Sequence, residues 1–371
     1  MTIGLHRPFN MPLKSLVWVC RFSKGYMQKK GHDFYIDFFL WMLSAIADHE
    51  DDFDEENAEG IVRPQNACLI LDQFAGSSYE DVKSRVRTTL TARATDADKV
   101  VYSNYKNTSY YITLAKKVNL VNGRGEQNLL GEKLAVVRDY QFFELSDKHR
   151  LIIFSALCPD FFDKLIIITQ GHRLVKGDRT LEDAFFRSFL KRSGNEGLIR
   201  YITSFNDNYL EVLRHWVKTL RLCTSAGMVR RMYLEEIARL DLRDYYETLI
   251  KKTESFFEDE FKARVKQEAQ YQKIRDSYEY FEKRGLTDLG YVNLYDIKKS
   301  FRLSFETFNE LLNSYYTQNR QKEIILFSNT VASIDQRRRF VVDGIAALKI
   351  RIIKKSLNGY KSTLDSFRAD Y

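Results

Sequence analysis

Apolar residues near the carboxyl end of the chain recur with the period of an α-helix. One stripe ends at Gly285, a residue type that commonly terminates helices, and consists of Tyr271, Ile274, Tyr278 and Phe281. Two further helical stripes follow, and Ser304 stands as N-cap of the second. Their expected buried faces are Leu294, Ile297 and Phe301, then Phe305, Phe308, Leu311, Leu312, Tyr315 and Tyr316. The pattern predicts three consecutive helices.

Beyond these helices the apolar period changes from 3.6 to 2. Residues 323–327 and 340–352 are rich in β-formers. In the second stretch apolar and basic side chains alternate in the order Leu348, Lys349, Ile350, Arg351, Ile352. A polar loop, residues 328–336, separates the stretches and runs into three basic residues, Arg337, Arg338 and Arg339. A two-stranded hairpin with a basic tip is therefore expected.

The first third of the chain carries a similar order of signals. Ser78 with Asp81, and Thr95 with Asp98, have the spacing of helix-capping pairs, and Thr108 can cap a third helix. The dipeptide Asn122-Gly123 then predicts a tight hairpin turn, followed by the short stretch 133–137. Three helices and a hairpin would make a second copy of the carboxy-terminal pattern.

The middle of the chain is expected to be helical. Ser146 is a candidate N-cap, and Pro159 suits the first turn of a following helix. Residues 228–284 contain almost no helix-breaker, and no proline follows Pro159. Aromatic residues at helical spacing here are expected in a core rather than around a cofactor. We predict a helical bundle or a long helical connector.

These patterns define the expected architecture. The fold class is mainly α with small β-hairpins. We expect an amino-terminal domain over residues 1–145, a helical bundle or connector over 146–265, and a carboxy-terminal domain over 266–371. No fixed-period repeat is visible in the sequence.

From about Ala269 to Ile353 the order helix, helix, turn, helix, hairpin resembles the winged helix-turn-helix superfamily. The resemblance implies winged-helix modules joined by the helical middle region, with the third helix entering the major groove of DNA and the wing contacting its backbone. On the third helix the implied DNA-binding residues are Ser304, Thr307, Asn309 and Asn313; Glu306 and Glu310 share their face and would repel phosphates. The implied wing contacts are Arg337, Arg338, Arg339, Lys349 and Arg351, and the first copy would add Lys116, Lys117 and Arg124.

Charge agrees with an anionic partner. The chain has 371 residues and a formal net charge of +8. Residues 337–371 hold nine basic and three acidic side chains, so part of the excess lies at the carboxyl end. Consecutive guanidiniums bind phosphates with a strength that falls steeply with salt.

Catalytic and cofactor motifs are absent from the sequence. It contains no Gly-x-x-x-x-Gly-Lys-Ser/Thr, no Gly-x-Ser-x-Gly and no His-Glu-x-x-His. The four cysteines and six histidines have no metal-ligand spacing. No signal-peptide core and no apolar run long enough for a membrane span occur. We therefore expect a cytoplasmic protein that is not an enzyme, with no cofactor, no metal site and no membrane partner.

Two main classes of function remain open, beside a third, a nuclease whose catalytic carboxylates only the fold would bring together. The first is a non-enzymatic protein that binds double-stranded DNA, as a transcription regulator or as the DNA-recognition subunit of a replication, segregation, mobile-element or phage-defence system. The second is a scaffold subunit that uses winged helices to pair with other protein subunits. Either class is compatible with a homodimer.

Overall fold

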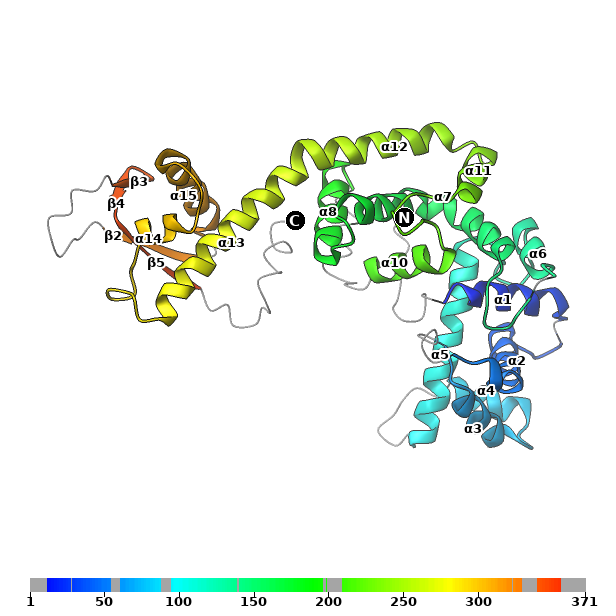
Figure 1. The fold of residues 1–371 in the computed structure, drawn as a ribbon. Helices are drawn as coiled ribbons and strands as arrows, with labels where there is room; N and C mark the ends of the chain where they lie inside the picture. Colours follow the sequence, from blue (N-terminus) through cyan, green and yellow to red (C-terminus); the bar gives the residue numbers. More distant parts are fainter. Residues whose placement is uncertain are drawn as a thin grey trace. The chain divides into compact units, whose positions relative to one another are not determined.

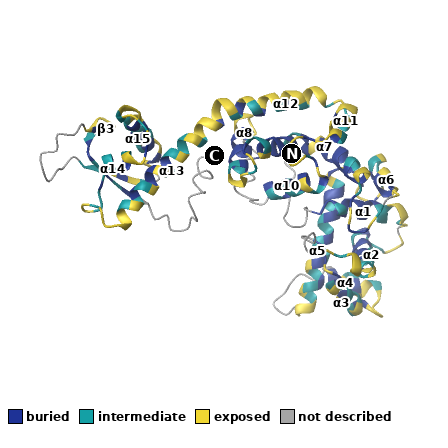
Figure 2. Cartoon of the chain, in the orientation of Figure 1, coloured by how far each residue is buried: buried dark blue, intermediate teal, exposed yellow. Residues whose placement is uncertain are grey.

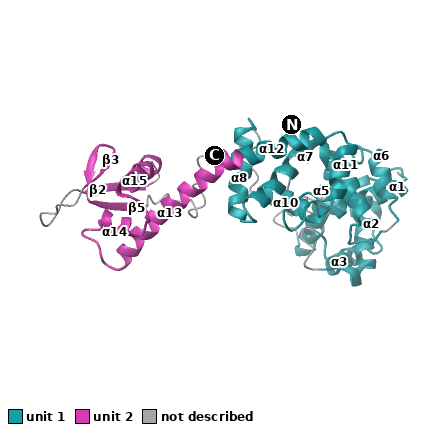
Figure 3. Cartoon of the chain, turned by 45° about the horizontal axis from the view of Figure 1, so that its top comes forward, with its two compact units in different colours: residues 1–255, 370–371 teal, residues 256–369 magenta. Residues whose placement is uncertain are grey.

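The computed structural model describes residues 12–27, 29–54, 61–87, 95–138, 140–195, 198, 209–321, 323–328 and 339–354. They divide into two compact units, one within residues 1–255 and the other within 256–369 (Figure 3). Most described residues are helical, and the strands are short and antiparallel (Figure 1). The prediction of a mainly α fold with small β elements is confirmed at this level.

The first part of unit 1 is a cluster of helices around an aromatic core. Trp18 stacks on Phe142 with ring centroids 4.9 Å apart and meets Tyr111 edge-on at 6.1 Å. The predicted capping box of Thr95 and Asp98 is formed. The elements are α1 (Lys14–Gly25), α2 (Phe34–Asp48), η1 (Glu50–Asp52), α3 (Pro64–Phe74), α4 (Tyr79–Arg87), α5 (Asp96–Lys117) and α6 (Leu129–Ala135).

The second part of unit 1 is built on one long buried helix. Trp216 packs edge-on against Phe161 at 5.1 Å, and Tyr233 packs against Phe154 at 5.0 Å, which fixes two later helices against that long helix. The elements are α7 (Asp147–Leu174), α8 (Arg179–Arg192), α10 (Tyr209–Leu220), α11 (Arg231–Arg239) and α12 (Arg243–Phe256).

One prediction for this region is wrong. Pro159 does not begin a helix but lies inside α7, where the surrounding buried side chains keep the helix continuous although proline offers no N–H to the carbonyl of Ser155. Most of the stretch 228–284 is helical, and the chain turns between α11 and α12, where Asp241 has a φ of 56°. Neither glycine nor proline marks this turn, so composition does not reveal it.

The predicted wing after α5 is also wrong. The side chain of Asn122 accepts the N–H groups of Arg124 and Glu126 at 2.8 and 3.0 Å, and the positive φ falls on Gly125, so a wider arch replaces the two-residue turn. Asn128 then caps α6, which makes Lys133 helical instead of extended. Only a single bridge, Val121 to Gln127, joins the two sides of the arch.

The same arch recurs between α10 and α11. In both places the helix ends at a residue with positive φ, Asn119 at 55° and Arg221 at 52°, and one isolated bridge closes the arch. The backbone hydrogen bonds of Leu120 to Ala115 and of Gly125 to Asn122 are matched in the second arch by those of Leu222 to Val217 and of Gly227 to Thr224. The equivalent residues of the two arches are 102 positions apart. The repeat is one of backbone structure, because few residue types are the same at equivalent positions of the two arches.

Unit 2 packs three helices against a small sheet. Strand β5 is central, in the order β1-β5-β2, and pairs with β2 from Glu323↔Lys354 to Ser328↔Lys349. The elements are η3, a π-helical turn (Phe257–Phe261), α13 (Lys262–Lys283), β1 (Val292–Asn293), α14 (Leu294–Lys299), α15 (Phe305–Asn319), β2 (Glu323–Ser328), β3 (Phe340–Val342), β4 (Ile345–Ala347) and β5 (Lys349–Lys354).

The buried stripes predicted for this unit form its core. Tyr271, Ile274 and Tyr278 of α13 lie in one cluster with Phe308 and Leu312 of α15, and each is at most 3% exposed. Figure 2 colours the chain by burial, and both helices contain buried stretches. The buried face of β5 completes the cluster with Ile350 and Ile352.

The expected long strand over residues 340–352 is divided into three. Asp343 and Gly344 have φ values of 48° and 76°, the combination of a tight two-residue turn, and they join β3 to β4 as a separate two-stranded hairpin. Only β5 pairs with β2. Among the described residues, no helix is long and apolar enough to cross a membrane.

Candidate nucleic-acid interface

Helix α15 is the predicted reading helix, and its N-terminus is capped as expected. The hydroxyl of Ser304 accepts the N–H of Thr307 at 3.1 Å and lies 3.0 Å from the Thr307 hydroxyl. Glu306 and Glu310 are exposed on the same helix. The first turns of α15 therefore present capping hydroxyls beside two carboxylates.

Further along α15, two predicted reading residues bind the protein's own backbone. The carbonyl oxygen of the Asn309 side chain accepts the N–H of Val341 at 2.8 Å. The Asn313 amide nitrogen donates to the carbonyls of Val341 at 2.6 Å and Asn309 at 3.0 Å, and its oxygen accepts the N–H of Asp343 at 2.9 Å. These bonds attach the β3–β4 hairpin to α15.

An aromatic contact fixes the same hairpin. Phe340, the first residue of β3, is fully buried, and its ring stacks on Phe305 of α15 with centroids 4.4 Å apart. Phe308 and Tyr295 approach the same ring at 5.6 and 5.1 Å. The hairpin is thus held to α14 and α15 by packing as well as by hydrogen bonds.

The basic residues of the predicted wing have different surroundings. Lys349 forms an ion pair with Asp288 at 2.6 Å, and its side chain is only 18% exposed. The Arg351 guanidinium lies along Gly290, where a Cβ would be 3.0 Å from its Nε. Arg339 is exposed, whereas Arg337 and Arg338 lie outside the described residues. Lys349 and Arg351 therefore lie on β5, within the three-stranded sheet, and not at the tip of the predicted wing.

A buried ionic network beneath this surface was not predicted from the sequence. Arg275 of α13 donates to Glu323 of β2 at 2.8 Å and to Asn319 of α15 at 2.8 Å. Tyr315 donates its hydroxyl to the same Glu323 carboxylate. Burial by itself would lower the pKa of Arg275, but Glu323 and Glu268 raise it overall, so the guanidinium stays charged. The network joins both helices to the sheet.

The three predicted DNA contacts of the amino-terminal region are close neighbours in sequence but have different surroundings in the structure. Lys116 of α5 donates to the Tyr35 hydroxyl at 3.2 Å and lies over its ring. Burial lowers the pKa of Lys117. Arg124 is exposed on the arch that follows. Lys117 and Arg124 are both exposed, whereas Lys116 is held against Tyr35.

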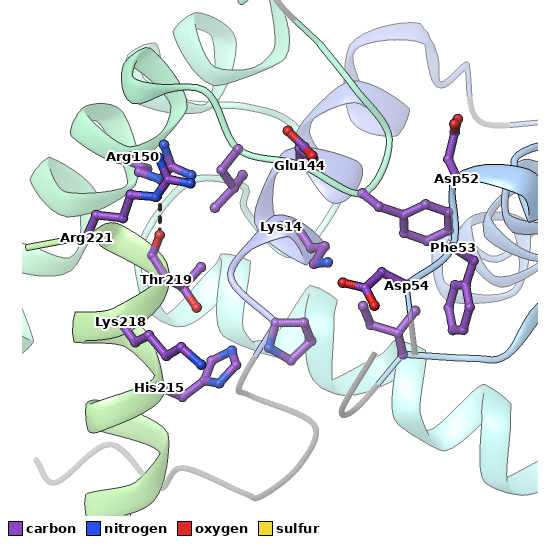
Figure 4. A pocket seen from close by; sticks show the side chains of 14 residues that line it. Lys14, Asp52, Phe53, Asp54, Glu144, Arg150, His215, Lys218, Thr219 and Arg221 are labelled. Carbon is purple, nitrogen blue, oxygen red and sulfur yellow. Dashed lines mark hydrogen bonds between the residues drawn. The ribbon is translucent and has the colours of Figure 1, made fainter. Parts of the chain in front are cut away.

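Unit 1 also contains a cavity of about 330 Å³ whose walls carry both charged and apolar side chains (Figure 4). Burial lowers the pKa of Lys14, while Asp54 and Glu144 act in the opposite direction. Arg150 donates to the backbone carbonyl of Thr219 at 3.1 Å. The lining residues are Pro12, Lys14, Asp52, Phe53, Asp54, Ile61, Phe143, Glu144, Leu145, Arg150, His215, Lys218, Thr219 and Arg221. With acids and bases on its walls, the cavity does not select one sign of ligand.

The described residues contain no group of three or more His, Cys, Asp or Glu side chains placed to hold a metal ion. Comparisons of the chain with family models, with curated proteins and with solved structures find no match.

Proposed function

We propose that unit 2 is a winged-helix module and that the protein binds double-stranded DNA through the wing that follows β2. The observation that carries the proposal is the topology: α13, β1, α14, α15, β2 and β5 follow in the order typical of winged helices, and β2 lies beside β5 in the sheet order β1-β5-β2. The chain between these strands contains Arg337, Arg338 and Arg339.

Charge chemistry supports the wing as the contact. Three consecutive arginines release condensed counterions when they meet phosphates, which favours binding at low salt. The exposed carboxylates of Glu306 and Glu310 on α15 would instead repel phosphates. The proposed contact is therefore to the DNA backbone through the wing.

A salt-titrated binding assay on the full chain tests this. The protein should bind duplex DNA at about 50 mM salt, and replacing Arg337, Arg338 and Arg339 together with Ala should weaken binding by at least roughly tenfold. The control removes three exposed arginines from unit 1, Arg231, Arg239 and Arg243, and changes the net charge equally. Absence of binding, or equal loss in both variants, would contradict the proposal.

A second function, pairing with another protein subunit, is favoured by exposed apolar side chains on the strands of unit 2. Ile324 and Leu326 of edge strand β2 are 41% and 39% exposed, and Val341 and Ile345 of the hairpin are 48% and 57% exposed. A stable complex on size exclusion that Leu326→Lys abolishes, together with no DNA binding, would favour this function over the first.

A further inference from the structure

We propose that the protein holds duplex DNA by its sugar–phosphate backbone without reading base sequence through α15, because the β3–β4 hairpin permanently occupies the part of α15 that would reach the bases. The inference rests on the proposed function and specifies the kind of DNA site: any duplex, independent of sequence.

Hydrogen-bond capacity is the first argument. An asparagine that reads adenine uses its amide oxygen and nitrogen together. Both N–H donors of Asn313 are already used, one on Val341 and one on Asn309, and its oxygen accepts from Asp343. The oxygen of Asn309 is likewise bonded to the Val341 N–H. Base reading would require these bonds to break.

Packing is the second argument. The hairpin could leave α15 only if Phe340, which is fully buried, separated from the Phe305 ring on which it stacks. On the exposed side of the hairpin, Val341 and Ile345 are about half exposed, and no residue from 340 to 347 is a cation that could bind a phosphate. The hairpin is therefore a fixed part of the module.

Charge is the third argument. The part of α15 that the hairpin leaves exposed carries Glu306 and Glu310, which would face phosphates in a groove. Arg302, just before the N-cap, is exposed and suits a backbone phosphate at the edge of a groove. A cation thus lies before the start of α15, while the middle of the helix is covered by the hairpin.

Two measurements on the full chain test the inference. Hydrogen exchange by mass spectrometry over residues 339–347 reports whether the hairpin stays attached to α15: slow exchange is expected in the wild type and faster exchange in Asn309→Ala/Asn313→Ala. Binding to two duplexes of equal length and unrelated sequence should differ by less than about threefold, and selection from a random duplex pool should enrich no motif. The control, Thr317→Ala/Gln318→Ala, changes exposed residues of the same helix and should leave both measurements unchanged.

The results of these measurements distinguish failure of the inference from failure of the proposed DNA binding. A preference of roughly tenfold or more for one sequence, abolished in the double-Asn variant, would overturn the inference and leave the proposed function standing. Equally fast exchange of the hairpin in wild type and variant would overturn its permanent attachment to α15. If neither duplex binds, the proposed function falls, and with it the assignment of a sequence-independent site.

Discussion

Gly125 turns the first arch at a φ of 81°, and its Cα faces the ring of Phe34 so closely that an added Cβ would overlap the ring. Gly76 has a nearly equal φ of 76° but nothing within 4 Å of such a Cβ. Both positions carry the backbone strain of a positive φ, but only Gly125 lacks room for a Cβ. Comparing the two therefore separates the energetic cost of the clash from the cost of the backbone conformation.

Gly125→Ala should therefore destabilise the protein more than Gly76→Ala. Both variants lose about 1 kcal/mol to the left-handed backbone, and the clash with Phe34 adds roughly 1–3 kcal/mol at Gly125. Urea unfolding of the full chain measures the difference. Equal midpoints for the two variants would mean that the arch does not pack against Phe34 as described.

The cysteines should differ sharply in reactivity. Burial raises the pKa of the Cys20 and Cys158 thiols to about 12, whereas Cys68 is only partly buried. Because the thiolate is the reactive form, Cys20 and Cys158 should react with a thiol reagent at pH 8 more than about 100-fold more slowly than Cys68. In denaturant all four cysteines should react alike. Fast native labelling of Cys20 would contradict its placement in the core.

At the scale of residues, sequence reasoning identified side chains but not always their partners. Asn309 and Asn313 were placed on one face of a helix, and they share it. Their bonds to Val341 and Asp343 could not be predicted, because nothing in a local pattern shows that a segment about thirty residues later returns to that face.

At the scale of elements, the apolar period predicted the helices of unit 2 well, since each must bury one stripe. It failed where a turn interrupts an apolar stretch. Asp343-Gly344 is itself a strong turn signal, but the β-rich residues on both sides hid it inside one expected strand. At Pro159 the error is the reverse: the sequence predicts the start of a new helix, but tertiary packing keeps α7 continuous through the proline.

The network around Arg275 holds two helices and a strand together, so its loss should destabilise unit 2. Arg275→Met leaves Glu323 buried without its cation, which costs roughly 3 kcal/mol. Lys283→Met on the same helix is the control: its ion pair with Glu279 is exposed, and the change should stay within about 0.5 kcal/mol. The melting temperatures of the two variants measure the loss of stability in each. A similar melting temperature for the two would show that the network does not stabilise the sheet.

At the scale of the whole molecule, composition predicted a basic, mainly helical chain but could not locate its contacts. The net charge of +8 is the small excess of many charges, and in the described residues numerous cations are neutralised in local pairs such as Lys349–Asp288. The topology of unit 2 adds what the charge alone lacks, because it supports our proposal that a wing between β2 and β5 contacts DNA.

The salt dependence of DNA binding is the sharpest test of the proposed contact between the wing and DNA. Measured for the full chain between low and moderate salt, the logarithm of the binding constant should fall linearly with the logarithm of salt concentration. Replacing Arg337, Arg338 and Arg339 with Ala should make that slope shallower by about two to three, one unit for each phosphate that the variant no longer neutralises. An unchanged slope in this variant, or no DNA binding by the wild type, would contradict the central claim.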